Sequence, residues 1–164
     1  MQDFNSALYS PLVSTMETIF IVAFIFSCIL VLYLYKNKSN YLITALPLFV
    51  LASHQLEEYV LSPLMFGDKY HFLEWAFRSG VNISPIEVTT INSVPYFLLP
   101  LLFLLKPSTK IFSILFLFNS SLLLSNGMFH IGLATAQTDY SPGMVTSLFM
   151  YIPCLLYTSP SPRD

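Results

Sequence analysis

Three ionisable side chains lie close together in an otherwise apolar segment of this chain: His54, Glu57 and Glu58. The apolar segment, residues 41–61, is long enough to cross a bilayer as a helix. A charged side chain near the middle of a membrane helix costs about 2.5–3.5 kcal/mol on insertion scales, so ionisable residues inside the membrane are usually functional. Helical spacing places both glutamates on the same face as His54. The motif therefore predicts a group that shares a proton or binds a metal ion.

The composition places this group in a membrane protein. Of the 164 residues, 55% are hydrophobic and only 10% are charged, and the mean hydropathy is +0.66. Soluble domains carry about 25% charged residues, so we expect the lipid bilayer to be the main partner of this chain. Because the sequence has no basic patch, a nucleic-acid partner is not expected.

The hydrophobic pattern predicts an all-α integral membrane helical bundle with about five transmembrane helices. The expected spans are residues 16–35, 41–61, 85–105 and 111–136, followed by a truncated helix that starts near Tyr140. Ser62-Pro63 is expected to end the second span, because a proline disfavours helix at the residue before it. Segment 64–84 is too polar to span and predicts an interfacial amphipathic helix, with His71 and Trp75 as anchors at the membrane surface.

The end of the chain differs in character from the rest. Residues 154–164 resemble the in-frame translation of a transposase sequencing adapter. We therefore expect a non-native tail, a natural chain interrupted near Pro153, and a natural C-terminus that lies beyond this sequence. The expected organisation is an N-terminal segment (1–15), one multi-pass membrane domain (16–153) and the tail (154–164).

Lysines in two predicted loops indicate the orientation. Lys36 and Lys38 lie in one loop, and Lys106 and Lys110 lie in another. In an alternating topology these loops lie on the same side, which the positive-inside rule assigns to the cytoplasm. The N-terminus and segment 62–84 then face outward, in a plasma or inner membrane.

This topology brings polar residues from three predicted spans to one depth. They lie in the later half of the second span, the first half of the third and the later half of the fourth. The set is His54, Glu57, Glu58, Glu87, Asn92, Asn126 and His130. We therefore predict a polar site in the outer leaflet, beneath segment 64–84.

The residue types in this set favour a metal site. We expect a divalent metal bound by His54, Glu58, His130 and Glu87, catalysis by Glu57 and Glu58, and support from Asn92 and Asn126. Two imidazoles, a carboxylate and a water suit catalytic zinc, and an open two-histidine, one-carboxylate face suits ferrous iron.

Three alternatives stay open. In the first, Glu87 only closes a capping box with Ser84. In the second, Asn126 only forms a hydrogen bond to a neighbouring helix. In the third, His130 is a structural core residue.

The preferred function is a metal-dependent membrane enzyme, such as a hydrolase acting on a lipid-like substrate that enters from the bilayer. A buried His/Glu cluster is also used in proton-coupled transport, although no inverted repeat is evident. In a third interpretation the protein is a non-catalytic membrane subunit whose cluster fixes helix packing. All three interpretations require the cluster to be buried between helices.

The motif and two later segments resemble one family. His54-Gln-Leu-Glu57-Glu58 is similar to the signature of the HxxEE family of multi-pass membrane proteins of unknown function. Residues 126–132 resemble the family's later helix with Asn and His, and residues 140–147 resemble the Pro-Gly start of its last helix. The resemblance covers roughly residues 45–153 and implies a membrane domain characterised by these residues. It implies no activity.

Overall fold

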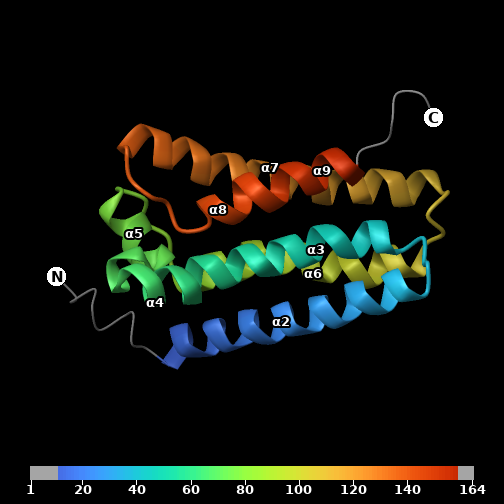
Figure 1. Ribbon diagram of the computed structural model, residues 1–164, viewed down its shortest axis with the longest axis horizontal. Helices are drawn as coiled ribbons and strands as arrows, with labels where there is room; N and C mark the ends of the chain where they lie inside the picture. Colours follow the sequence, from blue (N-terminus) through green and yellow to red (C-terminus); the bar gives the residue numbers. More distant parts are fainter. Residues whose placement is uncertain (1–10, 159–164) are drawn as a thin grey trace.

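The computed structural model describes residues 11–158, and all regular structure in that range is helical. The elements in chain order are α2 (Pro11–Lys36), α3 (Leu42–Leu56), η1 (Glu57–Leu61), α4 (Ser62–Phe66), η2 (Asp68–Tyr70), α5 (Phe72–Arg78), α6 (Pro85–Leu104), α7 (Lys110–Gln137), α8 (Met144–Thr146), η3 (Ser147–Tyr151) and α9 (Ile152–Thr158). The long helices run along the length of the molecule, with short helices gathered at one end (Figure 1). The predicted terminal segments lie only partly within the described residues, since 1–10 and 159–164 are outside them.

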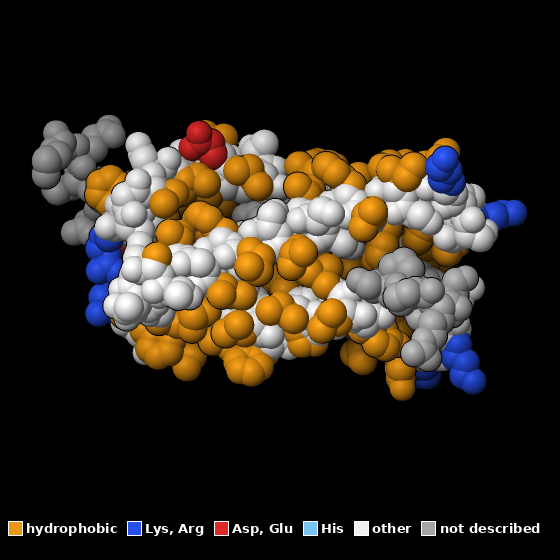
Figure 2. Space-filling model, turned by 90° about the horizontal axis from the view of Figure 1, so that it is seen from above, with side chains coloured by type: hydrophobic (Ala, Val, Ile, Leu, Met, Phe, Trp, Pro, Cys, Tyr) orange, Lys and Arg blue, Asp and Glu red, His pale blue; other side chains and the backbone are white. Residues whose placement is uncertain are grey.

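Three helices are long and apolar enough to cross a membrane: α2, α6 and α7. A shorter apolar helix covers Met144–Tyr157. Hydrophobic side chains cover the middle of the face in Figure 2, whereas Lys and Arg side chains lie at its two ends. The structure thus confirms an all-α protein with candidate membrane spans, and the count of five remains a prediction. The first helix begins at Pro11, five positions before its predicted start at Met16.

The prediction that Ser62-Pro63 ends the second span is wrong, because the chain stays helical from Leu42 to Phe66. The π-helical turn η1 makes this continuation possible. There the Ser62 N–H donates to the Glu57 carbonyl five residues back, and this wider turn accommodates Pro63, which has no N–H and would clash with an ordinary helical turn. The same device recurs in η3, where the Ile152 N–H donates to the Ser147 carbonyl just before Pro153.

Segment 64–84 forms the end of α4, the 3₁₀ turn η2 and the short helix α5, which together cover one end of the bundle (Figure 1). Phe72 and Trp75 of this segment pack inward against α2, in a core that includes Phe20. His71 and Trp75 are 5% and 1% exposed, so the prediction that they anchor the surface is wrong. Burial of Trp75 in this core is more favourable than a position at the membrane surface, because its apolar ring is fully removed from water there.

Helix α3 occupies the centre of the bundle and contacts α2, α6, α7 and α9. Ten of its fifteen residues are buried, among them the adjacent polar pair His54 and Gln55. Gln55 accepts a hydrogen bond from the Tyr96 hydroxyl of α6 at 2.8 Å. The central position of α3 places His54 where neighbouring helices can supply partners.

Candidate metal centre

His54, Glu58 and His130 meet in the interior of the bundle. Their side chains come from α3, from η1 and from α7, and one ligand atom from each lies within 4.8 Å of the others. Both histidines are 0% exposed and Glu58 is 2% exposed. The prediction that these three residues come together is confirmed, and the group could hold a metal ion.

One carboxylate oxygen faces both imidazoles. Glu58 Oε1 is 2.9 Å from His130 Nε2 and 3.4 Å from His54 Nε2. In a tetrahedral zinc site with metal–ligand distances of about 2.0–2.1 Å, neighbouring ligand atoms lie about 3.3 Å apart. The two observed distances bracket that spacing, and all three ligand atoms lie within 4.8 Å of one another, so the two imidazoles would draw closer together on binding an ion.

The outer nitrogen of His54 is held by Thr146. His54 Nδ1 lies 2.8 Å from Thr146 Oγ1, and the same hydroxyl donates to the Gly143 carbonyl at 3.1 Å. Because that hydroxyl has a single hydrogen, it accepts from an N–H at Nδ1. The neutral ring therefore carries its lone pair on Nε2, the nitrogen that faces Glu58.

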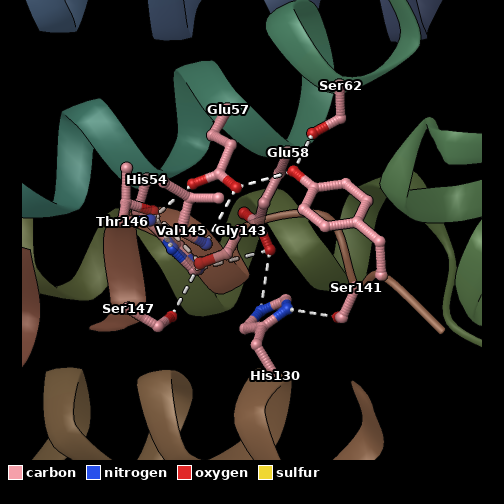
Figure 3. A network of polar contacts seen from close by, with 11 residues as sticks. His54, Glu57, Glu58, Ser62, His130, Ser141, Gly143, Val145, Thr146 and Ser147 are labelled. Atoms are coloured by element: carbon pink, nitrogen blue, oxygen red, sulfur yellow. Dashed lines mark hydrogen bonds and ion pairs between the residues drawn. The ribbon is translucent and has the colours of Figure 1, made fainter. Parts of the chain in front are cut away.

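This tautomer leaves two acceptors opposed to each other. A lone pair on His54 Nε2 and a carboxylate oxygen of Glu58 repel at 3.4 Å unless a proton or a cation lies between them. Within the described residues, the ion pairs of Glu58 join it to the two histidines only (Figure 3). An imidazolium or a metal ion would stabilise a buried carboxylate in such surroundings.

His130 is positioned by a second hydroxyl. Its Nδ1 lies 3.2 Å from Ser141 Oγ, and Ser141 is 0% exposed. Its ring also lies against Phe72 and Phe129, with centroid distances of 5.3 Å in both cases. Such an apolar wall strengthens electrostatic interactions inside the centre, because it excludes water.

Gly143 lets the backbone approach the centre. Its φ of +89° lies in the left-handed region, which favours glycine. A Cβ at this position would overlap His54 Cε1 and lie 3.0 Å from Glu58 Cγ. Any larger residue would displace the ligands themselves.

Glu57 is one position from Glu58 but serves a different set of partners. Its Oε1 accepts from the Tyr140 hydroxyl at 2.7 Å and from the Val145 N–H at 3.1 Å, and its Oε2 accepts from the Thr146 N–H at 2.7 Å. These amides begin the last helix, so Glu57 caps a helix of another segment. Burial raises the pKa of the Tyr140 phenol, and its bond to Glu57 raises it further. The Tyr140 hydroxyl therefore keeps its proton and donates the hydrogen bond to Glu57.

Glu87 is not brought to the group. Its side chain is exposed and accepts from the Ser84 N–H and hydroxyl at 2.8 and 2.7 Å, while the Glu87 N–H donates back to Ser84 Oγ. This is the capping box that was the alternative interpretation. Asn92 and Asn126 also lie outside the group and line a pocket between α6 and α7.

The residues that position the two imidazoles were not predicted from sequence. Ser141, Gly143 and Thr146 lie in the segment that resembles the start of the family's last helix, but no role followed from that resemblance. Nothing local in Ser141 or Thr146 points to a histidine, because both hydroxyls are ordinary in a turn or a first helical turn. Gly143 after Pro142 was the one recognisable signal of a turn.

The fold and this site together define a helical protein with candidate membrane spans and a buried His/Glu/His group. The sequence model of a family described as "Protein of unknown function with HXXEE motif" matches residues 45–158. The chain therefore belongs to the HXXEE family, with His54, Glu57 and Glu58 as the motif residues. The comparison with curated proteins and the comparison with solved structures gave no match.

The family match bears on the end of the chain. Both the match and helix α9 extend to residue 158, five positions beyond Pro153. Cys154 packs beside the core residues Val50, Leu51, Leu123 and Tyr151. The first turn of the segment that resembles an adapter thus takes part in the helix, and its non-native origin remains a prediction.

Proposed function

We propose that this protein is a metal-dependent membrane enzyme whose ion is bound by His54, Glu58 and His130. The observation that carries the proposal is the convergence of two Nε2 atoms on Glu58 Oε1, at 2.9 and 3.4 Å, in a buried site. Hydroxyl groups on both Nδ1 atoms add support. Histidine ligands of metals are commonly oriented in this way by a partner on the other ring nitrogen.

The donor set suits zinc or ferrous iron. Two imidazoles and one carboxylate leave at least one coordination position for water or substrate. A bound ion would act as a Lewis acid and lower the pKa of its water. Within the chain, His54 and His130 would bind and orient the ion, and Glu58 would supply the third ligand through Oε1.

A hydrolase acting on a lipid-like substrate is the form of this function that we favour. The sequence predicts Glu57 and Glu58 as the candidates for the general base. Glu57 already accepts three hydrogen bonds, so we assign the proton-accepting role to the second carboxylate oxygen of Glu58, which is not the proposed ligand atom. We assign Glu57 the task of positioning the last helix.

The proposed setting is a bundle of five membrane segments. Three are the long apolar helices α2, α6 and α7, and we add the helical stretches 42–66 and 144–158. The N-terminus would face outward and the loops with lysines would face the cytoplasm. The centre would then lie in the outer half of the bilayer, below the end formed by α4 and α5.

The metal content of the purified protein tests the proposal. We expect near-stoichiometric zinc or iron, by mass spectrometry, in the detergent-solubilised protein and its loss in His130→Ala and Glu58→Gln. His71→Ala is the matched control, because His71 is also buried but bonds to Glu17 outside the group. Metal absent from the folded protein, or retained equally in all variants, would overturn the proposal.

Proton-coupled transport is the second candidate, and one distance favours it. His130 Nε2 and Glu58 Oε1 are 2.9 Å apart, close enough to share a proton directly. In that case the purified protein contains no metal. Proteoliposomes would then show proton flux that His130→Ala abolishes and His71→Ala preserves.

A further inference from the structure

A pocket of about 220 Å³ opens between α3, α6 and α7, next to the metal centre. Leu51 and Leu123 form part of its wall, Ile91 lies at its rim, and Asn92 and Asn126 supply polar groups. Ile91 is 63% exposed, so the pocket is open at the surface that we place against lipid. Its volume equals about seven water molecules, enough for a small polar group and the first carbons of a chain.

The pocket and the centre lie on the same faces of two helices. Leu51 precedes His54 by three positions on α3, and Asn126 precedes His130 by four positions on α7. Residues with these spacings are stacked one turn apart on one face of a helix. A ligand in the pocket would therefore lie about one helical turn, or 5.4 Å along the axis, from the level of the two imidazoles.

Tyr151 separates the two sites. Its ring centroid is 4.9 Å from that of His54, and the same side chain packs in a core with Leu51 and Leu123. Its phenol is also close to the Asn126 side chain. Tyr151 belongs to the π-helical turn η3, and such turns are frequent at functional sites. Tyr151 thus contacts both a histidine of the centre and two residues of the pocket wall.

The chemistry of the pocket indicates what it takes. Its lining contains two carboxamides and a serine hydroxyl among aliphatic side chains and a proline, and none of its lining residues carries a charge. A carboxamide both donates and accepts hydrogen bonds, so it suits a hydroxyl or an ester. A phosphate or carboxylate would lose its hydration there without a cationic partner, at a cost of several kcal/mol.

We propose that this pocket binds a membrane lipid whose polar part is uncharged, such as a hydroxyl or an ester on a glycerol unit, with Tyr151 between it and the metal centre. The lipid enters from the bilayer past Ile91, and Asn92 and Asn126 bind its polar part. The role of this lipid as substrate rests on the metal-dependent enzyme proposed above. The binding of the lipid does not rest on it.

Photo-crosslinking in nanodiscs tests the proposal. The probe is a monoacylglycerol with a diazirine on the first carbons of its acyl chain, and the labelled positions are identified by peptide mass spectrometry. The test variant is Ile91→Trp, which fills the rim. The matched control is Ile86→Trp on the same helix, because Ile86 is 65% exposed and is not among the lining residues. Metal content is measured on each sample.

We expect labelling on α6 and α7 around the pocket, lowered roughly tenfold by Ile91→Trp and unchanged by Ile86→Trp, which corresponds to about 1.4 kcal/mol of binding. Unlabelled monoacylglycerol should compete, and lysophosphatidic acid with the same acyl chain should not. Equal labelling of both variants would show that the lipid does not bind in this pocket. Stronger competition by the phosphate lipid would show that the bound lipid is not of the uncharged class. If the protein shows the expected labelling but contains no metal, the lipid site is confirmed and only the proposal of a metal-dependent enzyme is overturned.

Discussion

His54 and Thr146 are 92 positions apart in the chain, yet His54 Nδ1 and Thr146 Oγ1 are 2.8 Å apart. Thr146 lies in the first turn of the last helix, and its own N–H donates to Glu57. One residue thus orients His54 of the buried group through its side chain and docks its helix through its backbone. The centre is therefore complete only when the last helix is in place.

Replacing Thr146 tests the orienting hydroxyl. We expect Thr146→Val to weaken metal binding by about 10- to 100-fold, the usual effect of removing a partner on the outer ring nitrogen of a histidine ligand. Thr146→Ser keeps the hydroxyl and should bind metal as the unaltered protein does. Competition with a chelator measures both affinities. Similar affinities for the Val and Ser variants would show that the hydroxyl does not orient His54.

Glu57 and Glu58 should differ when each is changed to glutamine. Glu57→Gln replaces an acceptor by an amide that faces backbone N–H groups, so we expect a loss of about 2–3 kcal/mol in the free energy of unfolding, measured by SDS titration. The fraction that stays folded should still bind metal. Glu58→Gln should lose metal with a smaller effect on unfolding. The reverse pattern would exchange the roles assigned to the two glutamates.

Gly143 should tolerate no side chain. We expect Gly143→Ala to destabilise the protein and to remove metal, because the added Cβ meets His54 and Glu58. Gly80→Ala is the matched control: its φ of +80° imposes a comparable backbone penalty of about 1 kcal/mol, but nothing lies within 4 Å of the added Cβ. Thermal unfolding and metal content check both variants. Equal behaviour of the two would mean that backbone strain alone explains the effect.

His71 should make stability depend on pH. Burial lowers its pKa to about 4, against the opposing effect of the Glu58 and Asp68 charges. Between about pH 4 and the ordinary value near 6.5, the unfolded chain then binds more protons than the folded one. Stability from this group is therefore present above pH 6.5 and is lost as the pH falls toward 4.

The comparison of His71→Gln with the unaltered protein isolates this contribution. We expect the melting temperature of the unaltered protein to fall more steeply between pH 7 and pH 5 than that of the variant. Glu17 lies 3.2 Å from His71 Nε2, so Glu17→Gln should be measured beside it. Parallel curves for His71→Gln and the unaltered protein would show that folding does not lower the pKa of His71.

Local properties of the sequence were enough to predict the class of the protein and part of its centre. Hydrophobicity and helical spacing act within a few turns, so the helices and the shared face of His54 and Glu58 could be predicted without tertiary information. The addition of His130 depended on comparing depths across predicted spans, and the structure confirms it. The capping box of Glu87 was also a local pattern, and it proved to be the better interpretation.

Only the tertiary structure decided which motif glutamate faces the histidines. Glu57 and Glu58 are adjacent and equally acidic, and a rotation of about 100° around one helix separates their directions. Glu57 meets backbone amides of the last helix, whereas Glu58 meets two imidazoles. This division depends on where the last helix docks and on the π-helical turn that begins at Glu57. Contacts between segments more than 80 positions apart have no counterpart in local spacing, because packing of the whole bundle creates them.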